Sequence, residues 1–312
     1  MAYSDDTRIL IKIARMYYEE GATQAEIAEV LGVSRPLISK YLTKAKESRL
    51  VEIRIHDEMA HTYSSLESTL EKKFNLREAI VIDEINSPAG KHNLGAAAGN
   101  YLLRVVKKNH TIGVSSGTTL VEVATAMPGG NLPNVIVVPL VGGMGDERLD
   151  IHANQLAVQI AERLQADYKL LHAPVVVDSP EAKTLFLEQS SIAEVFNLAS
   201  HCDIAIVGIG GAPEHSTMVK NYFGPNFQKE FTESDVIGDI CYNFINQKGE
   251  ASSISWNERV LSLPLETLKA IPLVIGVAHG EEKVQSIRAA LTGGLVNVLV
   301  TDEPTAQQLI QD

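Results

Sequence analysis

The sequence predicts an α/β protein with two domains, a winged helix-turn-helix domain over residues 1–56 and a Rossmann-like domain over residues 77–312. A helical linker is expected over residues 57–76. Helical spacings separated by capping signals fill the first domain, whereas short apolar runs alternate with helix-like segments in the second. A length of 312 residues also agrees with two domains.

Composition narrows the class of protein. The chain is 45% hydrophobic and 21% charged, as ordinary globular proteins are. Its longest apolar runs fall well short of the roughly 18 residues that a transmembrane helix needs, and the N-terminus has no signal-peptide core. We therefore expect a cytoplasmic protein without membrane contact. Cys202 and Cys241 have no metal-binding spacing, so we expect reduced thiols, no metal and no cofactor.

Charge is distributed unevenly along the chain. The net charge is -12, but residues 1–56 carry +1 and the remainder carries -13. Such acidity excludes a protein that binds nucleic acid through a diffuse positive surface. The first domain nevertheless has a basic stripe between positions 31 and 54, made of Arg35, Lys40, Lys44, Lys46, Arg49 and Arg54.

Three helices and a strand are predicted in the first domain. Apolar residues from Ile9 to Tyr17 recur at helical spacing, and Gly21 can end that helix. Thr23-Gln24-Ala25-Glu26 reads as a capping box that opens a second helix ending near Leu31. Gly32 and Ser34 predict the turn and the cap of a third helix ending near Ser48. Residues 51–56 alternate with period two, as a wing strand would.

Numbering from Gln24 gives a helix-turn-helix register. Position five is then Ala28, position nine is Gly32 and position fifteen is Ile38, which are the small, turn and buried aliphatic residues that this motif needs. The opposite face of the third helix can reach base edges and phosphates in a major groove, although a solvated helix face is the alternative. The candidate DNA-binding residues are Gln24, Ser34, Arg35, Ser39, Lys40 and Thr43.

Seven strands are expected in the second domain, at residues 79–83, 111–115, 135–140, 169–173, 203–209, 273–278 and 296–301. Continuous apolar strands separated by helices favour a parallel sheet covered on both faces. Ligands bind such sheets at the carboxyl ends of the strands.

Glycine-rich turns follow several of these strands. Residues 113–119 join a strand to a helix with small and hydroxyl residues, which suits an anion, although a plain turn is the alternative and no Walker A ending is present. Gly142 and Gly143 belong to a second such turn, and residues 208–211 and 276–280 form two more. Together these turns predict the mouth of a ligand pocket.

Two charged residues near these turns are further candidates. Lys283 lies in the first turn of a predicted helix and could meet a phosphate, whereas Asp239 could accept hydrogen bonds from sugar hydroxyls. A surface lysine and a turn cap are the alternatives. His152 and His279 have no partners at catalytic spacing, so no catalytic residue is predicted.

The whole chain resembles the SorC family of bacterial transcriptional regulators. The resemblance rests on "YYEEGATQAEIAEVLGVSRPLISKYL", "GVSSGTT", "VGGMG", "AIVGIG", "GDICYNFINQKG" and "GVAHGEEKVQSIRAALTGGLVNVLVTD". It implies a second domain with the fold of sugar-phosphate isomerases but without turnover, a phosphorylated sugar effector, operator DNA and a tetramer, a dimer of dimers. The effector-binding residues expected from the turns and the resemblance are Ser115, Ser116, Gly117, Thr118, Thr119, Gly142, Gly143, Gln155, Asp239, Cys241 and Lys283.

One position departs from part of this family. Deoxyribonucleoside regulators that the chain resembles carry a lysine directly before the Gly-Gly pair, where it forms a Schiff base with an aldehyde sugar phosphate. This chain has Val141 there, so we expect non-covalent binding. The alternatives are a sugar-phosphate isomerase with an added DNA-binding segment and an oligomeric DNA-binding protein without a ligand.

Overall fold

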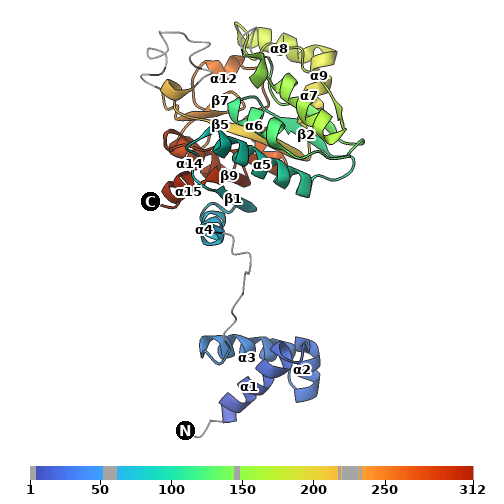
Figure 1. Ribbon diagram of the computed structural model, residues 1–312, viewed down its shortest axis with the longest axis vertical. Coiled ribbons are helices and arrows are strands. Elements are labelled where there is room, and N and C mark those ends of the chain that lie inside the picture. The colour runs from blue at the N-terminus through green and yellow to red at the C-terminus, as the bar shows by residue number, and fades with distance from the viewer. Residues whose placement is uncertain are drawn as a thin grey trace. The chain divides into compact units, whose positions relative to one another are not determined.

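The computed structural model describes residues 5–51, 62–143, 148–216, 219, 231 and 234–311 (Figure 1). By its internal contacts the chain divides into two compact units, Met1–His61 and Thr62–Asp312. The described part of the first unit is helical, and the second combines helices with a sheet. None of the helices in the described ranges is long and apolar enough to cross a membrane.

Three helices form the first unit, namely α1 (Asp5–Tyr18), α2 (Gln24–Leu31) and α3 (Arg35–Glu47). Their apolar faces share one small core, made of Ile13, Ile27, Ala28, Ile38 and Leu42. The buried residues of α3, Ile38, Leu42 and Ala45, lie three or four positions apart, which is the spacing of one helix face, and α2 contributes the adjacent Ile27 and Ala28. The apolar pattern of the sequence therefore accounts for this packing.

Local signals fix the bounds of α2 and the turn after it. The Thr23 amide donates to Glu26 Oε2 at 2.7 Å and the Glu26 amide donates to Thr23 Oγ1 at 3.3 Å, so the predicted capping box is present. Gly32 ends α2 in the left-handed region at φ 65°. Ser34 is the N-cap of α3, but its side chain makes no capping hydrogen bond. The strand predicted over residues 51–56 lies outside the described residues, apart from Val51.

The second unit contains a sheet with seven parallel strands in the order β1-β9-β8-β5-β2-β3-β4. Their bounds are β1 (Glu78–Ile82), β2 (Thr111–Val114), β3 (Ile136–Pro139), β4 (Asp167–Tyr168), β5 (Ile204–Gly210), β8 (Leu273–Val277) and β9 (Val298–Asp302). An antiparallel hairpin, β6 (Gly238–Ile240) and β7 (Asn243–Ile245), continues from the end of β5. The predicted α/β class with a parallel sheet is confirmed.

Both faces of this sheet are covered. Helices α5 (Pro88–Val105), α6 (Thr118–Ala126) and α7 (Ala153–Leu164) pack on one face. The other face is covered by further elements, among them α4 (Ser64–Phe74), α9 (Ser190–Ser200), α13 (Leu265–Ala270), α14 (Val284–Thr292) and α15 (Glu303–Ile310). In β5, Ile204 and Ile206 pack in the core under α5, α6 and α7. Ala205 and Val207 pack in the core on the opposite face of the sheet. Burial of both faces explains why the strand is continuously apolar.

The remaining described helices are short. They are α8 (Pro180–Glu188), α12 (Trp256–Arg259), and the short 3-10 segments η1 (Leu149–Ile151), η2 (Pro213–His215) and η4 (Glu281–Lys283). Segment η4 lies between β8 and α14 and ends at Lys283.

One strand was placed wrongly from the sequence. The strand expected at residues 169–173 is instead β4, which pairs with β3 two residues earlier. The cause is a side chain from α7, because Asn154 Oδ1 accepts from the Leu171 amide at 2.8 Å and Asn154 Nδ2 donates to the Leu171 carbonyl at 3.0 Å. Both backbone groups of Leu171 are thereby taken by an amide side chain.

Helix α4 lies within the segment expected to be a linker, and it packs on the second unit. Its Leu70 is fully buried. The carboxylates of Glu67 and Glu71 accept from the amides of Val81 and Ala79 at 2.8 and 3.0 Å. Because β1 is the edge strand, these carboxylates cover amide groups that would otherwise be open to pairing with another chain.

Candidate functional site

Helix α3 presents one polar face to solvent. Arg35, Ser39, Lys40 and Thr43 are exposed, and Ser34 just before the helix is exposed as well. On the opposite side Ile38 is fully buried. The structure thus places the predicted DNA-binding residues of this helix together on one surface.

Gln24 joins this surface at the start of α2. It lines a shallow hollow together with Arg35 and with residues from the end of α1 to the start of α2, namely Tyr17, Gly21, Ala22, Thr23 and Ala25. The first turns of α2 and α3 therefore lie side by side, and both present the amide dipoles of a helix start. A Gln amide and an Arg guanidinium facing one hollow can donate to the same stretch of phosphate backbone.

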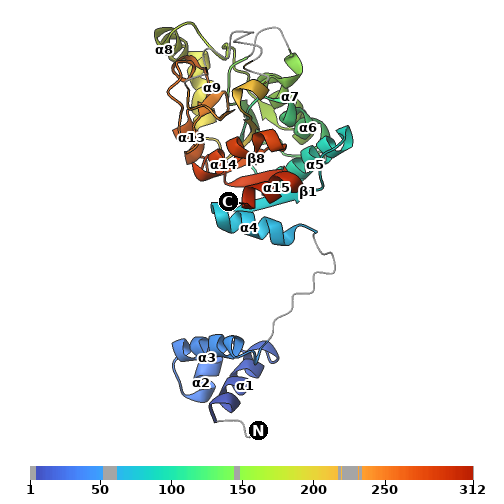
Figure 2. The same cartoon turned by 90° about the vertical axis from the view of Figure 1, so that its left-hand side faces the viewer.

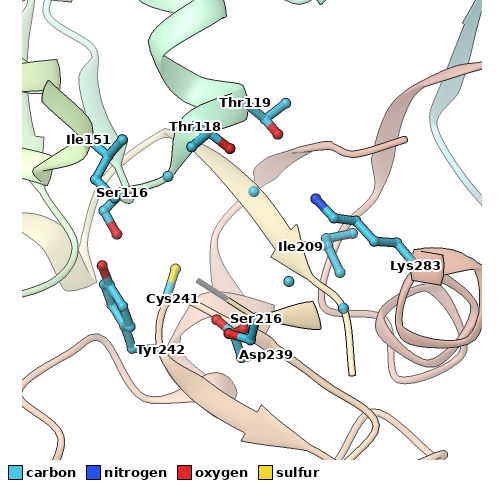
Figure 3. Close-up of a pocket in the computed structure, with 14 residues that line it drawn as sticks. Ser116, Thr118, Thr119, Ile151, Ile209, Ser216, Asp239, Cys241, Tyr242 and Lys283 are labelled. Carbon is cyan, nitrogen blue, oxygen red and sulfur yellow. The ribbon is translucent and has the colours of Figure 1, made fainter. Parts of the chain in front are cut away.

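The second unit contains a cavity of about 120 Å³ at the carboxyl ends of its central strands (Figure 3). Six segments meet there: the loop from β2 into α6, η1, the end of β5, the residue after η2, the β6–β7 hairpin and η4. The lining residues are Ser116, Gly117, Thr118, Thr119, Ile151, Gly208, Ile209, Gly210, Gly211, Ser216, Asp239, Cys241, Tyr242 and Lys283. This is where ligands bind in parallel α/β sheets.

One wall of the cavity is the start of α6. The amide of Gly117 donates to the Ile151 carbonyl at 3.1 Å, and the amide of Ser115 donates to the Ile206 carbonyl at 3.1 Å, so the loop is fixed to its neighbours. Thr118 and Thr119 are the first two residues of α6, where amide groups have no partner inside the helix. Such a helix start favours an anion through its amides and its dipole.

Lys283 reaches into the cavity beside this helix start, with its ammonium group towards Thr119 (Figure 3). Burial lowers the pKa of Lys283, while the carboxylates of Glu282 and Asp239 act in the opposite direction. No ion pair joins its ammonium group to another residue of the described ranges. A desolvated ammonium group next to a helix start is a strong site for a phosphate dianion.

Asp239 lies on the hairpin across the cavity from α6 (Figure 3). Burial raises the pKa of Asp239 to about 6, against the lowering effects of Lys283 and of a hydrogen bond from the Tyr242 backbone. The facing residue is Gly210, and a Cβ there would overlap the Asp239 carboxylate. Glycine at position 210 therefore makes room for a carboxylate that can accept hydrogen bonds from two neighbouring hydroxyls of a ligand.

A strained turn places two more side chains in the cavity. Cys241 and Tyr242 connect β6 to β7 with φ 51° and 60°, although neither is glycine. Asn243 Nδ2 donates to the Cys241 carbonyl at 3.2 Å and to Ser262 Oγ at 3.0 Å, and Trp256 Nε1 donates to the Tyr242 carbonyl at 2.8 Å. Strained backbone of this kind persists where its surroundings fix it, and it concentrates at functional sites.

The two side chains contribute different chemistry. The Tyr242 hydroxyl points towards Ser116, and the Cys241 thiol lies between them and Asp239 (Figure 3). Burial raises the pKa of Cys241, so its thiol stays protonated and is a poor nucleophile. The turn therefore supplies shape and one hydroxyl to the cavity.

Seven of the residues predicted to bind the effector line the cavity, namely Ser116, Gly117, Thr118, Thr119, Asp239, Cys241 and Lys283. Four others do not. Ser115 is buried behind the loop, Gln155 is exposed on α7, and Gly142 and Gly143 pair with other backbone segments. A Cβ at Gly142 would overlap the Pro174 carbonyl, so this glycine allows two chain segments to approach closely.

Several lining residues were missed by the sequence reasoning. The sequence predicts a glycine-rich turn at residues 208–211, but it gives no reason to single out individual residues of that turn. Tyr242 carried no signal because a non-glycine residue at positive φ cannot be recognised from sequence. Ile151 and Ser216 are brought in by tertiary packing alone.

The surroundings of the cavity offer little other chemistry. No group of three His, Cys, Asp or Glu side chains in the described ranges could hold a metal ion. His279 is partly buried, and burial together with Lys283 lowers its pKa. Val141, at the position of the absent lysine, is 1% exposed and does not line the cavity.

Comparison with known proteins agrees with this geometry. Residues 59–311 match the family described as "Putative sugar-binding domain". The chain is 32% identical to the sorbitol operon regulator of Klebsiella pneumoniae, with 100% of both chains covered, and its structure matches the crystal structure of that full-length regulator with a TM-score of 0.76. It is also 32% identical to the deoxyribonucleoside regulator of Bacillus subtilis, with 98% of both chains covered. The chain belongs to the SorC family of transcriptional regulators.

Membership of the SorC family decides between the interpretations of the sequence. The relatives are named as transcriptional regulators, so the protein is a regulator and the alternative of a sugar-phosphate isomerase is not supported. A SorC-family regulator needs a DNA-binding element, and the helix-turn-helix of the first unit is the candidate in this chain.

Proposed function

We propose that this SorC-family regulator controls carbohydrate genes by binding a phosphorylated sugar or sugar alcohol in the cavity of its second unit. The observation that carries the proposal is the pairing of an anion site with an acceptor site in one cavity. Thr118, Thr119 and Lys283 would bind the phosphate, and Asp239 would accept from hydroxyl groups. A DNA-binding protein without a ligand would have no use for a desolvated lysine and carboxylate in one cavity.

Binding would be non-covalent. Val141 cannot form an imine, and the Cys241 thiol is kept protonated by burial. Names of relatives point to two chemical classes, since one is a sorbitol operon regulator and another a deoxyribonucleoside regulator. Without a lysine at position 141 we favour ketose and alditol phosphates. Sodium borohydride should then trap no adduct with sugar aldehydes, as checked by intact-protein mass.

The first unit would bind operator DNA through α3. Arg35 and Lys40 would contact guanine edges or phosphates, Ser34, Ser39 and Thr43 would add hydrogen bonds, and Gln24 would hold a phosphate. Because this unit carries a charge of only +1 over residues 1–56, a single copy can neutralise few phosphates. A tetramer that presents several recognition helices would supply the missing affinity. Because it would act on the chromosome, we expect it in the cytoplasm.

The test measures DNA affinity with and without sugar phosphates. DNA sites are selected from a random pool with the wild-type protein, and affinity is measured by fluorescence anisotropy across pentose, hexose and hexitol phosphates. One or more should change the dissociation constant by about 5- to 150-fold, the usual size of allosteric coupling. Lys283→Met should abolish the response, whereas Lys169→Met, which removes an exposed lysine of the same unit, should not. A wild-type protein that ignores the whole panel would contradict the proposal.

A further inference from the structure

Helix α15 connects the lysine of the cavity to helix α4. On the cavity side, the Gly280 amide donates to Thr305 Oγ1 at 2.9 Å, and Gln308 Nε2 donates to Glu281 Oε1 at 3.0 Å. Thr305 is only 1% exposed, so the first of these bonds is shielded from water. Gly280 and Glu281 lead directly into Lys283 through η4, so a ligand that shifts the backbone at Lys283 would act on two hydrogen bonds of α15.

The same helix is held to α4 at both ends. The Tyr63 hydroxyl, just before α4, lies 2.7 Å from Asp83 Oδ1 and 3.1 Å from Glu303 Oε2. At the other end, Lys73 Nζ donates to the Ile310 carbonyl at 3.0 Å. The two views agree that α4 lies beside β1 and α15 (Figure 1, Figure 2). Helix α4 is also the first described helix after residue 51, where the described part of the DNA-binding unit ends.

The contact at Tyr63 has two alternatives built into it. One hydroxyl carries one proton, so it donates fully to only one of two carboxylates at a time. Asp83 follows β1, whereas Glu303 begins α15. A shift of α15 relative to the sheet would therefore change which carboxylate accepts from Tyr63 at the start of α4. Elements with two discrete arrangements are what allosteric coupling requires.

We infer that Tyr63 is a positioning residue through which the cavity controls the DNA-binding unit, with Thr305 as the preceding contact. The inference rests on the proposed function. It assigns no ligand contact to either residue, so each should change the response to sugar phosphate and not its binding. That distinction separates coupling from a purely structural role.

The test compares Tyr63→Phe with wild type in the full chain, using selected DNA and the sugar phosphate to which wild type responds. The readout is the ratio of DNA dissociation constants with and without saturating sugar phosphate. In Tyr63→Phe we expect this ratio to fall to within about twofold of one, while the sugar phosphate dissociation constant without DNA stays within about threefold of wild type. Tyr168→Phe removes the hydroxyl of an exposed tyrosine and should keep the full response.

A second variant guards against an unstable first one. Thr305→Val removes the acceptor for Gly280 at a separate point of the same path, and the double variant should lose no more coupling than either single variant. A Tyr63→Phe protein with the wild-type ratio overturns the inference, as does one whose sugar phosphate affinity falls as much as its coupling. Failure of wild type to respond to any sugar phosphate instead overturns the proposed function itself, so the two failures are distinguishable.

Discussion

Replacing Asp239 with asparagine should stabilise the second unit while weakening ligand binding. Burial raises the pKa of Asp239 from 3.8 to about 6, so at pH 7 the fold holds a carboxylate where it favours the protonated acid. A shift of roughly two units, at about 1.4 kcal/mol each, corresponds to about 3 kcal/mol. The asparagine side chain would carry no charge and could still accept from the Tyr242 backbone, so the free energy of unfolding of Asp239→Asn should rise by up to that amount.

The dependence on pH follows with a definite sign. Between pH 3.8 and about 6 the folded protein holds a proton on Asp239 that the unfolded chain has released, so the contribution of this group to stability falls as pH rises. Well above pH 6 Asp239 is ionised in both states, and the full cost of burying its charge reduces the stability of the fold. The advantage of Asp239→Asn should therefore be largest at pH 7, shrink to roughly half at pH 5, and vanish below pH 4.

Trp256 provides the assay. It is the single tryptophan of the chain, it is buried in the second unit, and its indole donates to the Tyr242 carbonyl in the hairpin that carries Asp239. Urea unfolding followed by its fluorescence at pH 7 and pH 5, without sugar phosphate, gives both free energies. Asp178→Asn removes an exposed carboxylate and should change stability by less than about 0.5 kcal/mol. Loss of a charged acceptor should also weaken sugar phosphate binding about 10- to 100-fold in Asp239→Asn. A variant that is less stable than wild type at pH 7, with the wild-type pH profile, would refute this account of the carboxylate.

Three other substitutions test the two units independently. Gly210→Ala should weaken sugar phosphate binding more than tenfold by calorimetry, because its Cβ would overlap the Asp239 carboxylate. The control is Gly129→Ala, where the nearest atom to a Cβ is 3.7 Å away and binding should be unchanged. Equal effects of the two substitutions would contradict the predicted overlap. Arg35→Ala should lower DNA affinity. If Arg35 contacts a phosphate, the slope of log affinity against log salt concentration should fall by about one for each first unit bound, and if it contacts a base, specificity should relax at one position. An unchanged affinity would show that Arg35 is not in the interface. Thr23→Ala removes the capping box, so the free energy of unfolding of the first unit, followed by circular dichroism, should fall by about 1 kcal/mol. The unfolding transition reported by Trp256 fluorescence should not change. A shift of that transition would show that the two units unfold together.

Elements set by local signals were predictable from the sequence. The start of α2 depends on Thr23 and Glu26, and its end depends on Gly32, all close to one another along the chain. The apolar strands followed from burial on two faces, and the position of residues 116–119 in the cavity wall followed from a strand that ends in small residues before a helix.

Features set by distant partners were not predictable. Strand β4 ends early because the Asn154 side chain makes hydrogen bonds with both backbone groups of Leu171. Helix α4 packs beside the sheet, where its glutamates accept from amides at the edge of β1. Tyr242 enters the cavity through a turn whose strain is held by Trp256, fourteen residues away. A linear pattern carries no record of such pairings, so the bounds of the site needed the fold.

The net charge of -12 takes a more specific meaning once the chain is divided. The acidity belongs to the residues after 56, which hold the cavity, whereas the basic stripe belongs to the DNA-binding unit. In the described part of that stripe Arg35, Lys40, Lys44 and Lys46 are all exposed, so each can approach phosphates. Four such charges release few counterions, and the affinity of one copy should be modest and strongly dependent on salt. An acidic second unit would also be repelled by DNA, so that only the basic stripe can approach it. In the proposed tetramer, a response to sugar phosphate would need little energy per copy, because several weakly bound copies acting together would convert a small change in each into a large change in occupancy.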